Sequence, residues 1–145
     1  QNHTMRMALQ IGVPPRHHRE LVERFGFPWY DVYGLSETGL NLAMPPHLAD
    51  SYIGTGAIGL PVPEVDVEIV DRAGLPLTGE TIGELAVSGP FMMAGYLNNP
   101  QETANVTLGR FLRTGDEISG PSQFSMVRAW LLAGVGRGVS RRRRA

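Results

Sequence analysis

The segment "EVDVEIVD", residues 64–71, alternates apolar and acidic side chains, and this alternation limits the possible fold more than any other feature of the chain. Val65, Val67 and Ile69 form the apolar series, with acidic residues between them. Successive side chains of a β-strand point to opposite faces, so a period of two buries one face and leaves the other in water. The segment therefore predicts a strand in a sheet with one solvated face.

The residues that follow continue the β pattern. The turn residues "DRAG", 71–74, separate this strand from "GELAVSG", which predicts a second strand through Leu85 and Val87. With the apolar residues of "GPFMMAGY", these segments predict a small sheet or barrel from about Ile58 onward. "NNPQETANVT" then predicts a loop and a short helix, and "GRFLRTGDE" predicts a turn at residues 114–116.

The N-terminal part has a different, mixed pattern. "PPRHHRELVERFG" predicts a helix that begins at its prolines and ends at Gly26. His17 and His18 are adjacent in its first turn and cannot share a helix face, so we expect two solvated side chains rather than a metal site. "FPWYDVYG" predicts a buried strand, which places "YGLSETG", residues 33–39, on the loop after it. Ligands bind at such loops in open α/β sheets.

Composition excludes several kinds of chemistry. A chain of 145 residues with 42% hydrophobic residues is long enough for one ordinary domain. It contains no cysteine, which excludes disulfides, thiolate metal sites and a cysteine nucleophile, and agrees with a cytoplasmic location. It contains no lysine either, so an ammonium group must come from outside the chain. No apolar stretch is long enough for a transmembrane segment.

Charge divides the chain near residue 118. Residues 1–118 hold seven Arg and fourteen acidic residues, a net charge of −7, whereas residues 119–145 hold six Arg and no acid, a net charge of +6. The second segment also lacks the apolar alternation, and we interpret it as a divergent basic tail that is disordered or translated out of frame. The alternative is a functional tail that binds RNA or an acidic membrane through Arg141–Arg144. We do not expect a specific nucleic-acid partner.

Four blocks carry a resemblance to a known family. "YGLSETG", "GAIGLPVPEVDVEIVD", "GELAVSGPFMMAGYLNNPQET" and "RTGD" occur in the order found in the adenylate-forming (AMP-binding) enzymes, which include acyl-CoA synthetases, the adenylation domains of peptide synthetases and firefly luciferase. The resemblance covers about Met5 to Ile118. It implies the last part of the large N-terminal domain: an α/β layer followed by a small distorted β-barrel, with the remaining N-terminal and C-terminal parts of the enzyme missing.

The resemblance also implies a reaction. Family members join a carboxylic acid to the α-phosphate of ATP and pass the acyl group to a thiol such as coenzyme A, with Mg²⁺ neutralising the phosphates. By resemblance, Tyr33 packs on adenine, Gly34 allows close backbone approach, and the Ser36 hydroxyl donates to phosphate. Most members have threonine at the position of Ser36, and either hydroxyl can donate. Glu37 is the implied magnesium ligand, and Ser36 and Glu37 are the implied catalytic residues.

Two further segments complete the implied nucleotide site. Asp116 of "RTGD" is expected to accept hydrogen bonds from the ribose hydroxyls. "IGVPP" resembles the family segment that lies along the adenine, so Gly12, Val13 and Pro14 are candidate cofactor-binding residues. Ile11 stands where the family has its first glycine, which puts a close backbone contact there in doubt.

Each assignment has a structural alternative. Tyr33 can be a core aromatic residue, Gly34 a turn residue, Ser36 with Glu37 a helix cap, and Asp116 part of a plain Gly-Asp turn. The function also has alternatives: an adenylation domain that loads a carrier protein, or a non-catalytic nucleotide-binding or interaction fragment. Because the phosphate loop and the lysine-bearing domain of the family have no counterpart here, we expect the chain alone to be inactive.

Overall fold

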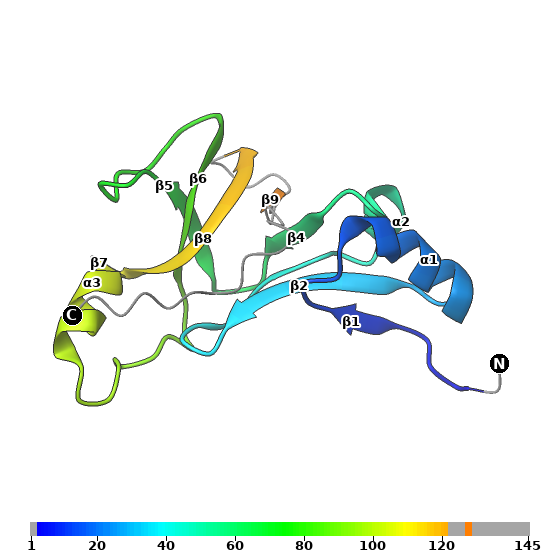
Figure 1. Cartoon of the computed structure of the whole chain (residues 1–145), viewed down its shortest axis with the longest axis horizontal. Helices are drawn as coiled ribbons and strands as arrows, with labels where there is room; N and C mark the ends of the chain where they lie inside the picture. Colours follow the sequence, from blue (N-terminus) through cyan, green and yellow to red (C-terminus); the bar gives the residue numbers. More distant parts are fainter. Residues whose placement is uncertain (1–2, 122–126, 129–145) are drawn as a thin grey trace.

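The computed structural model describes residues 3–121 and 127–128, and in them the helices lie near the two ends of a long curled sheet (Figure 1). The elements are β1 (Ala8–Gln10), α1 (Pro15–Phe25), β2 (Trp29–Leu35), β3 (Gly39–Ala43), α2 (Ala49–Tyr52), β4 (Ala57–Pro61), β5 (Asp66–Val70), β6 (Glu80–Ser88), α3 (Pro100–Val106), β7 (Thr107–Leu108), β8 (Phe111–Pro121) and β9 (Val127–Arg128).

The described strands form one sheet in the order β1-β2-β3-β4-β9-β8-β6-β5, and β7 pairs with β8. The β1–β2 pair is parallel, and every other pair is antiparallel. Strands β5, β6 and β8 lie away from α1 and α2, toward the end of the molecule that carries α3 (Figure 1). The predicted class, an α/β layer followed by a small distorted β-barrel, is confirmed, and the barrel part is a curled half-barrel.

Helix α1 begins and ends where the sequence predicts. Pro15 occupies its first turn, and Gly26 at its C-terminal end has φ 73° while its N–H donates to Val22 O over 2.9 Å. The positive φ explains the glycine, since other residues avoid this conformation. One prediction here is wrong: His17 is exposed, but His18 is only 5% exposed, because helix α1 turns it inward against β2.

The predicted alternation in β5 produces the core of the curled sheet. Ile69 is 4% exposed and pairs in register with Leu85 of β6, which is fully buried. The turn after β5 is also confirmed, since Asp71 Oδ1 accepts hydrogen bonds from the backbone N–H groups of Ala73 and Leu75 over 2.8 and 2.9 Å. The core cluster comprises Leu42, Ile69, Leu85, Val87 and Ile118.

The predicted turn at residues 114–116 is wrong in one respect: these residues lie inside strand β8. In the pairing of β8 with β6, Arg113 lies opposite Ala86 and Glu117 lies opposite Glu84. The three residues of β8 between them, 114–116, therefore stand opposite Leu85 alone. This is a bulge with two extra residues, and bulges of this kind redirect side chains. Strand β8 continues past the charge boundary to Pro121. Residues 122–126 and 129–145, where most of the predicted basic tail falls, lie outside the described residues.

Candidate functional site

The motif "YGLSETG" forms the hairpin between β2 and β3. Tyr33, Gly34 and Leu35 are the last residues of β2 rather than part of a loop, and residues 36–38 make the turn, closed by the Thr38 N–H donating to Leu35 O over 3.2 Å. A Cβ on Gly34 would lie 2.2 Å from the carbonyl oxygen of Gly39. The hairpin itself therefore requires glycine at this position, and the predicted nucleotide role of Gly34 stays a prediction.

Tyr33 and Asp116 meet although they are 83 residues apart in sequence. The Tyr33 hydroxyl donates a hydrogen bond of 2.6 Å to Asp116 Oδ2. Burial, and next this hydrogen bond to a carboxylate, raise the pKa of Tyr33 well above its ordinary value. Tyr33 therefore stays a neutral donor near neutral pH. The two residues that the sequence predicts at adenine and at ribose are joined directly.

Glu37 lies in the same hairpin turn and contacts the segment between β6 and α3. The Tyr96 hydroxyl donates to Glu37 Oε1 over 3.1 Å, and the Met93 N–H donates to the Glu37 carbonyl oxygen over 2.7 Å. Glu37 and Tyr96 line a pocket of about 220 Å³ together with Thr114 and Gly115 of the β8 bulge. The predicted acid and the "RTGD" segment therefore share one pocket. Ser36, next to Glu37, is exposed.

The bulge that carries Asp116 is held by Glu84 of β6. Glu84 Oε2 accepts from Arg113 Nε over 3.0 Å and also from Arg113 Nη2, and Oε1 accepts from the Gly115 N–H over 2.9 Å. Thr114 Oγ1 donates to Leu85 O over 2.8 Å and accepts from the Asp116 N–H over 3.2 Å. The hydrogen bond to Glu84 raises the pKa of Arg113 above its usual value, so the guanidinium of Arg113 stays charged.

The third predicted segment, Gly12, Val13 and Pro14, connects β1 to α1. Gly12 is exposed with φ 68°, and Pro14 precedes the helix. Strand β1 runs parallel to β2 and ends at Gln10, which lies opposite Asp31. The chain therefore leaves the sheet beside Asp31, which precedes Tyr33 in β2 by two residues. Among the described residues, no hydrogen bond joins it to Tyr33, Glu37 or Asp116. Its place beside the nucleotide stays a prediction.

A buried polar cluster beside this segment escaped the sequence analysis. Gln10 Nε2 donates to Asp31 Oδ1 over 2.8 Å, and His18 Nδ1 lies 3.4 Å from Asp31 Oδ2. His18 also contacts Trp29 O over 2.9 Å and accepts from the Gly54 N–H over 3.3 Å. Burial raises the pKa of Asp31, while Gln10 and His18 act in the opposite direction. The available signal was a polar residue, Gln10 or Asp31, inside each of two otherwise apolar strand patterns.

Glu84 and Tyr96 were also missed as site residues. Both stood inside a quoted family block, but nothing in sequence spacing shows that a glutamate in one strand contacts an arginine 29 residues later. Within the described part of the chain, no three His, Asp or Glu side chains gather as a ready-made metal site. No helix in that part is long and apolar enough to span a membrane.

Comparison with known proteins identifies the family. The family model described as "AMP-binding enzyme" matches residues 4–97, which is more than half of the chain. The chain belongs to the AMP-binding enzyme family. The matched region contains the β2–β3 hairpin with Glu37, and it ends one residue after Tyr96. The recognition made from the four sequence blocks is therefore confirmed.

Individual members of the AMP-binding family resemble this chain in sequence and structure. A medium/long-chain-fatty-acid–[acyl-carrier-protein] ligase, FadD10 of Mycobacterium tuberculosis, is 37% identical over 103 residues, which are 66% of this chain and 19% of that protein. A D-alanine–D-alanyl carrier protein ligase of Lacticaseibacillus casei is 36% identical over 106 residues, covering 68% and 21%. The amide bond synthetase McbA of Marinactinospora thermotolerans superposes with TM-score 0.73 at 32% identity, covering 85% and 25%.

The chain therefore spans about a fifth of the length of the curated relatives that it matches. The names of those relatives include both CoA ligases and carrier-protein ligases; a long-chain-fatty-acid–CoA ligase of Salmonella typhimurium is 37% identical over 84 residues, 58% of this chain and 15% of that protein. The match shows the AMP-binding enzyme family, whose members named here differ in their acyl acceptor.

Proposed function

We propose that this chain supplies part of the nucleotide site of an ATP-dependent acid–thiol ligase. The parent enzyme activates a carboxylic acid as an acyl-adenylate and transfers the acyl group to coenzyme A. The observation that carries the proposal is the 2.6 Å hydrogen bond from Tyr33 to Asp116, which brings the hairpin and the β8 bulge to one place. Glu37 and the bulge also line one pocket of about 220 Å³, which supports a shared ligand.

In this proposal each residue acts through its ordinary chemistry. Asp116 has two carboxylate oxygens, and only Oδ2 is used by Tyr33, so the carboxylate can accept from ribose hydroxyls as well. The neutral Tyr33 ring presents an apolar face for a base to pack on. The exposed Ser36 hydroxyl is positioned in the turn to donate to a phosphate oxygen, a charge-assisted bond.

Glu37 fits the role of a magnesium ligand. Mg²⁺ binds through one or two carboxylates and completes its shell with substrate phosphates and water, so the lack of a three-residue metal cluster among the described residues does not oppose it. When bound, Mg²⁺ neutralises phosphate charge and favours attack on the α-phosphate. The hydrogen bond from Tyr96 to Oε1 holds the Glu37 carboxylate in one orientation at the pocket.

A carrier-protein thiol is the alternative acceptor. It is favoured by relatives whose names include acyl-carrier-protein and D-alanyl carrier protein ligases. The full-length enzyme, incubated with ATP and its acid, distinguishes the two acceptors. Mass spectrometry would find the acyl thioester on coenzyme A or on the carrier's phosphopantetheine arm. A product on the carrier alone would replace coenzyme A in the proposal.

Calorimetry with AMP, and with ATP plus Mg²⁺, tests the site in this chain. Asp116→Ala should weaken AMP binding by about tenfold or more, since a hydrogen bond to a charged group contributes about 1.5–3 kcal/mol. Glu37→Ala should weaken the binding of ATP with Mg²⁺ but leave AMP binding near the wild-type value. Glu80→Ala, an exposed glutamate at the start of β6, is the control. Unchanged binding in both site variants would remove the assignment.

A further inference from the structure

The bulge in β8 contains the left-handed backbone that aims Asp116 at Tyr33. Gly115 has φ 77°, and the bulge gives β8 three residues opposite Leu85. A strand with two inserted residues loses its regular ladder bonds there, so other groups must satisfy the freed backbone donors. The Gly115 N–H is one such donor, and its acceptor is a side chain, Glu84 Oε1, at 2.9 Å.

Glu84 uses both carboxylate oxygens on this bulge. Oε1 holds the Gly115 N–H, while Oε2 receives Nε and Nη2 of Arg113. The two donors stand on either side of Thr114, so one carboxylate spans the beginning of the inserted segment. The Glu84 and Arg113 side chains are 21% and 27% exposed, which shields the pair partly from water and salt. One rigid β6 residue thereby fixes the path of the chain into Asp116.

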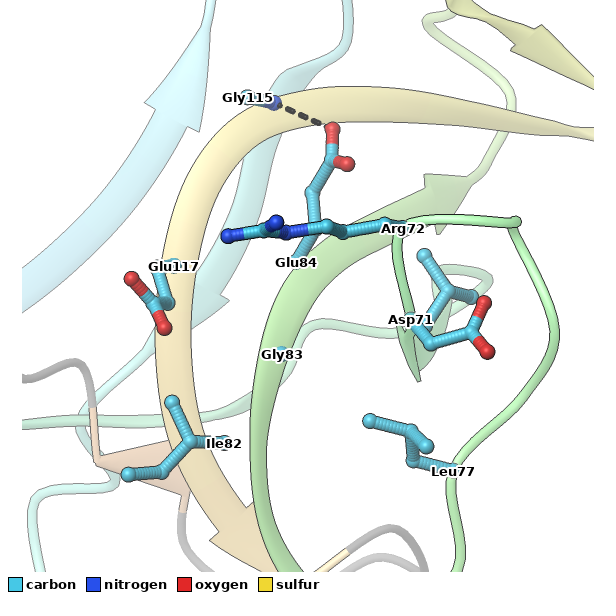
Figure 2. Close-up of a pocket in the computed structure, with 9 residues that line it drawn as sticks. Asp71, Arg72, Leu77, Ile82, Gly83, Glu84, Gly115 and Glu117 are labelled. Carbon is cyan, nitrogen blue, oxygen red and sulfur yellow. Dashed lines mark hydrogen bonds between the residues drawn. The ribbon is translucent and has the colours of Figure 1, made fainter.

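Glu84 also lines two pockets. It lines the 220 Å³ pocket that holds Glu37, and together with Gly115 it lines a second pocket of about 390 Å³. Figure 2 shows the second pocket, with the Glu84 carboxylate directed at the Gly115 amide while Arg72 and Glu117 lie along the walls. Glu84 is thus a wall of the candidate site as well as the anchor of its bulge.

We propose that Glu84 is a positioning residue: by binding Arg113 and the Gly115 N–H at once, it sets the orientation in which Asp116 accepts the ribose hydroxyls. The inference rests on the proposed nucleotide site and adds a residue to it. Glu84 itself contacts neither ribose nor phosphate in this account. Its effect on binding passes through the geometry of Asp116, whose own N–H is tied to Thr114 Oγ1 in the same bulge.

The test uses the full chain and the near-isosteric variant Glu84→Gln. Glutamine has one carbonyl oxygen in place of two carboxylate oxygens, so it can accept from Gly115 or from Arg113 but not from both in this geometry. Glu80→Gln, at the exposed start of the same strand, is the matched control. Thermal unfolding checks that each variant folds. A second variant, Arg113→Gln, removes the other half of the pair, and the double variant should add little to either single change.

The binding of two ligands distinguishes a role of Glu84 in positioning Asp116 from a general loss of structure. Binding of AMP should weaken about tenfold in Glu84→Gln, the size expected for loss of a well-placed charge-assisted bond. Binding of 2′,3′-dideoxyadenosine monophosphate, which lacks the hydroxyls that Asp116 accepts, should stay within about twofold of the wild type. Equal weakening for both ligands, or unchanged AMP binding, would overturn the inference.

Hydrogen exchange provides a readout that does not depend on nucleotide. Exchange of the Gly115 amide, or of Arg113 Nε, should become faster in Glu84→Gln than in Glu80→Gln. Unchanged exchange at both groups would show that Glu84 does not hold the bulge. If Asp116→Ala loses AMP while Glu84→Gln binds it normally, the proposed function stands and this inference is wrong. If the wild-type chain binds no AMP, both are overturned.

Discussion

The interiors of the curled sheet and of the α/β layer differ in polarity. The interior of the curled sheet is apolar and closed, and Leu85, Val87 and Ile118 in it are 1% exposed or less. The layer formed by β1, α1 and β2 buries apolar residues such as Val32 at 8%, but it also buries polar side chains, with Gln10 at 4% and His18 at 5% exposure. Both regions contribute to the proposed nucleotide site, but different forces hold them together.

This difference in polarity affects how each region is stabilised. An apolar core is stabilised by burial alone, whereas a buried polar cluster contributes only while each donor and acceptor has a partner. Gln10 Oε1 and Trp29 Nε1 are buried without a partner among the described residues. Leu9 and Ile11, at the edge strand β1 and just after it, are 60% and 72% exposed. Exposed apolar side chains occur in the curled half as well, such as Leu75 at 63% and Ile82 at 64%, so the two halves differ in the buried polar cluster and not in apolar exposure.

Removing core volume from the curled sheet should give the largest effect. Ile118→Ala should lower the free energy of unfolding by about 2–5 kcal/mol, because it leaves a cavity in a closed apolar core. Ile82→Ala is the matched control, since Ile82 is 64% exposed on β6, and it should cost far less. Urea denaturation measures both. Similar losses in the two variants would mean that the curled sheet is not the closed core described above.

A substitution in the buried polar cluster should give the second-largest loss of stability. His18→Ala should lower the free energy of unfolding by about 1–3 kcal/mol, since it removes the buried contacts of His18 with Trp29 O, the Gly54 N–H and Asp31 Oδ2. His17→Ala, at the adjacent exposed position, should change stability by no more than about 0.5 kcal/mol. The same urea titration measures both. Equal effects would show that burial of His18 does not contribute to the stability of the layer.

Asp31 should make the free energy of unfolding depend on pH. We expect this change to be smaller than the loss of stability in His18→Ala. Its pKa is raised in the fold, so its stabilising contribution is present below the ordinary value of 3.8 and is lost as the pH rises through the folded-state pKa. Asp31→Asn cannot ionise. Its stability relative to the wild type should therefore increase over that rise in pH. Asp50→Asn, an exposed control, should show no such trend. A relative stability of Asp31→Asn that falls instead would contradict the direction of the shift.

The smallest effect is expected at the exposed edge of the layer. Leu9→Thr should change the free energy of unfolding by no more than about 0.5 kcal/mol, since Leu9 is 60% exposed and threonine suits a strand. Circular dichroism during thermal unfolding measures it. A loss of about 2 kcal/mol or more, as for a core leucine, would show that Leu9 is buried in solution by a further contact at the edge strand β1.

Sequence reasoning succeeded where a structural feature depends on neighbours along the chain. The helix that ends at Gly26, the Asp71 turn and the strand through Ile69 follow from backbone preferences and side-chain period, both of which are local. It failed for His18, because its helix position says which face it occupies but not what packs on that face. It also failed for residues 114–116, because a bulge is defined by the partner strand, and the pairing of β8 with β6 cannot be read from β8 alone.

The sequence by itself determined the family, the short motifs that suggest a nucleotide, and those elements whose pattern is local, such as helix α1 and the strand through Ile69. Only the tertiary structure decided that Tyr33 contacts Asp116 across 83 residues, that Glu37 contacts Tyr96 across 59, and that Glu84 holds the bulge through Arg113 and the Gly115 N–H. The physical reason is one of range. Local pattern fixes which way each side chain points from its own backbone, whereas the meeting of two distant side chains depends on how the whole sheet curls.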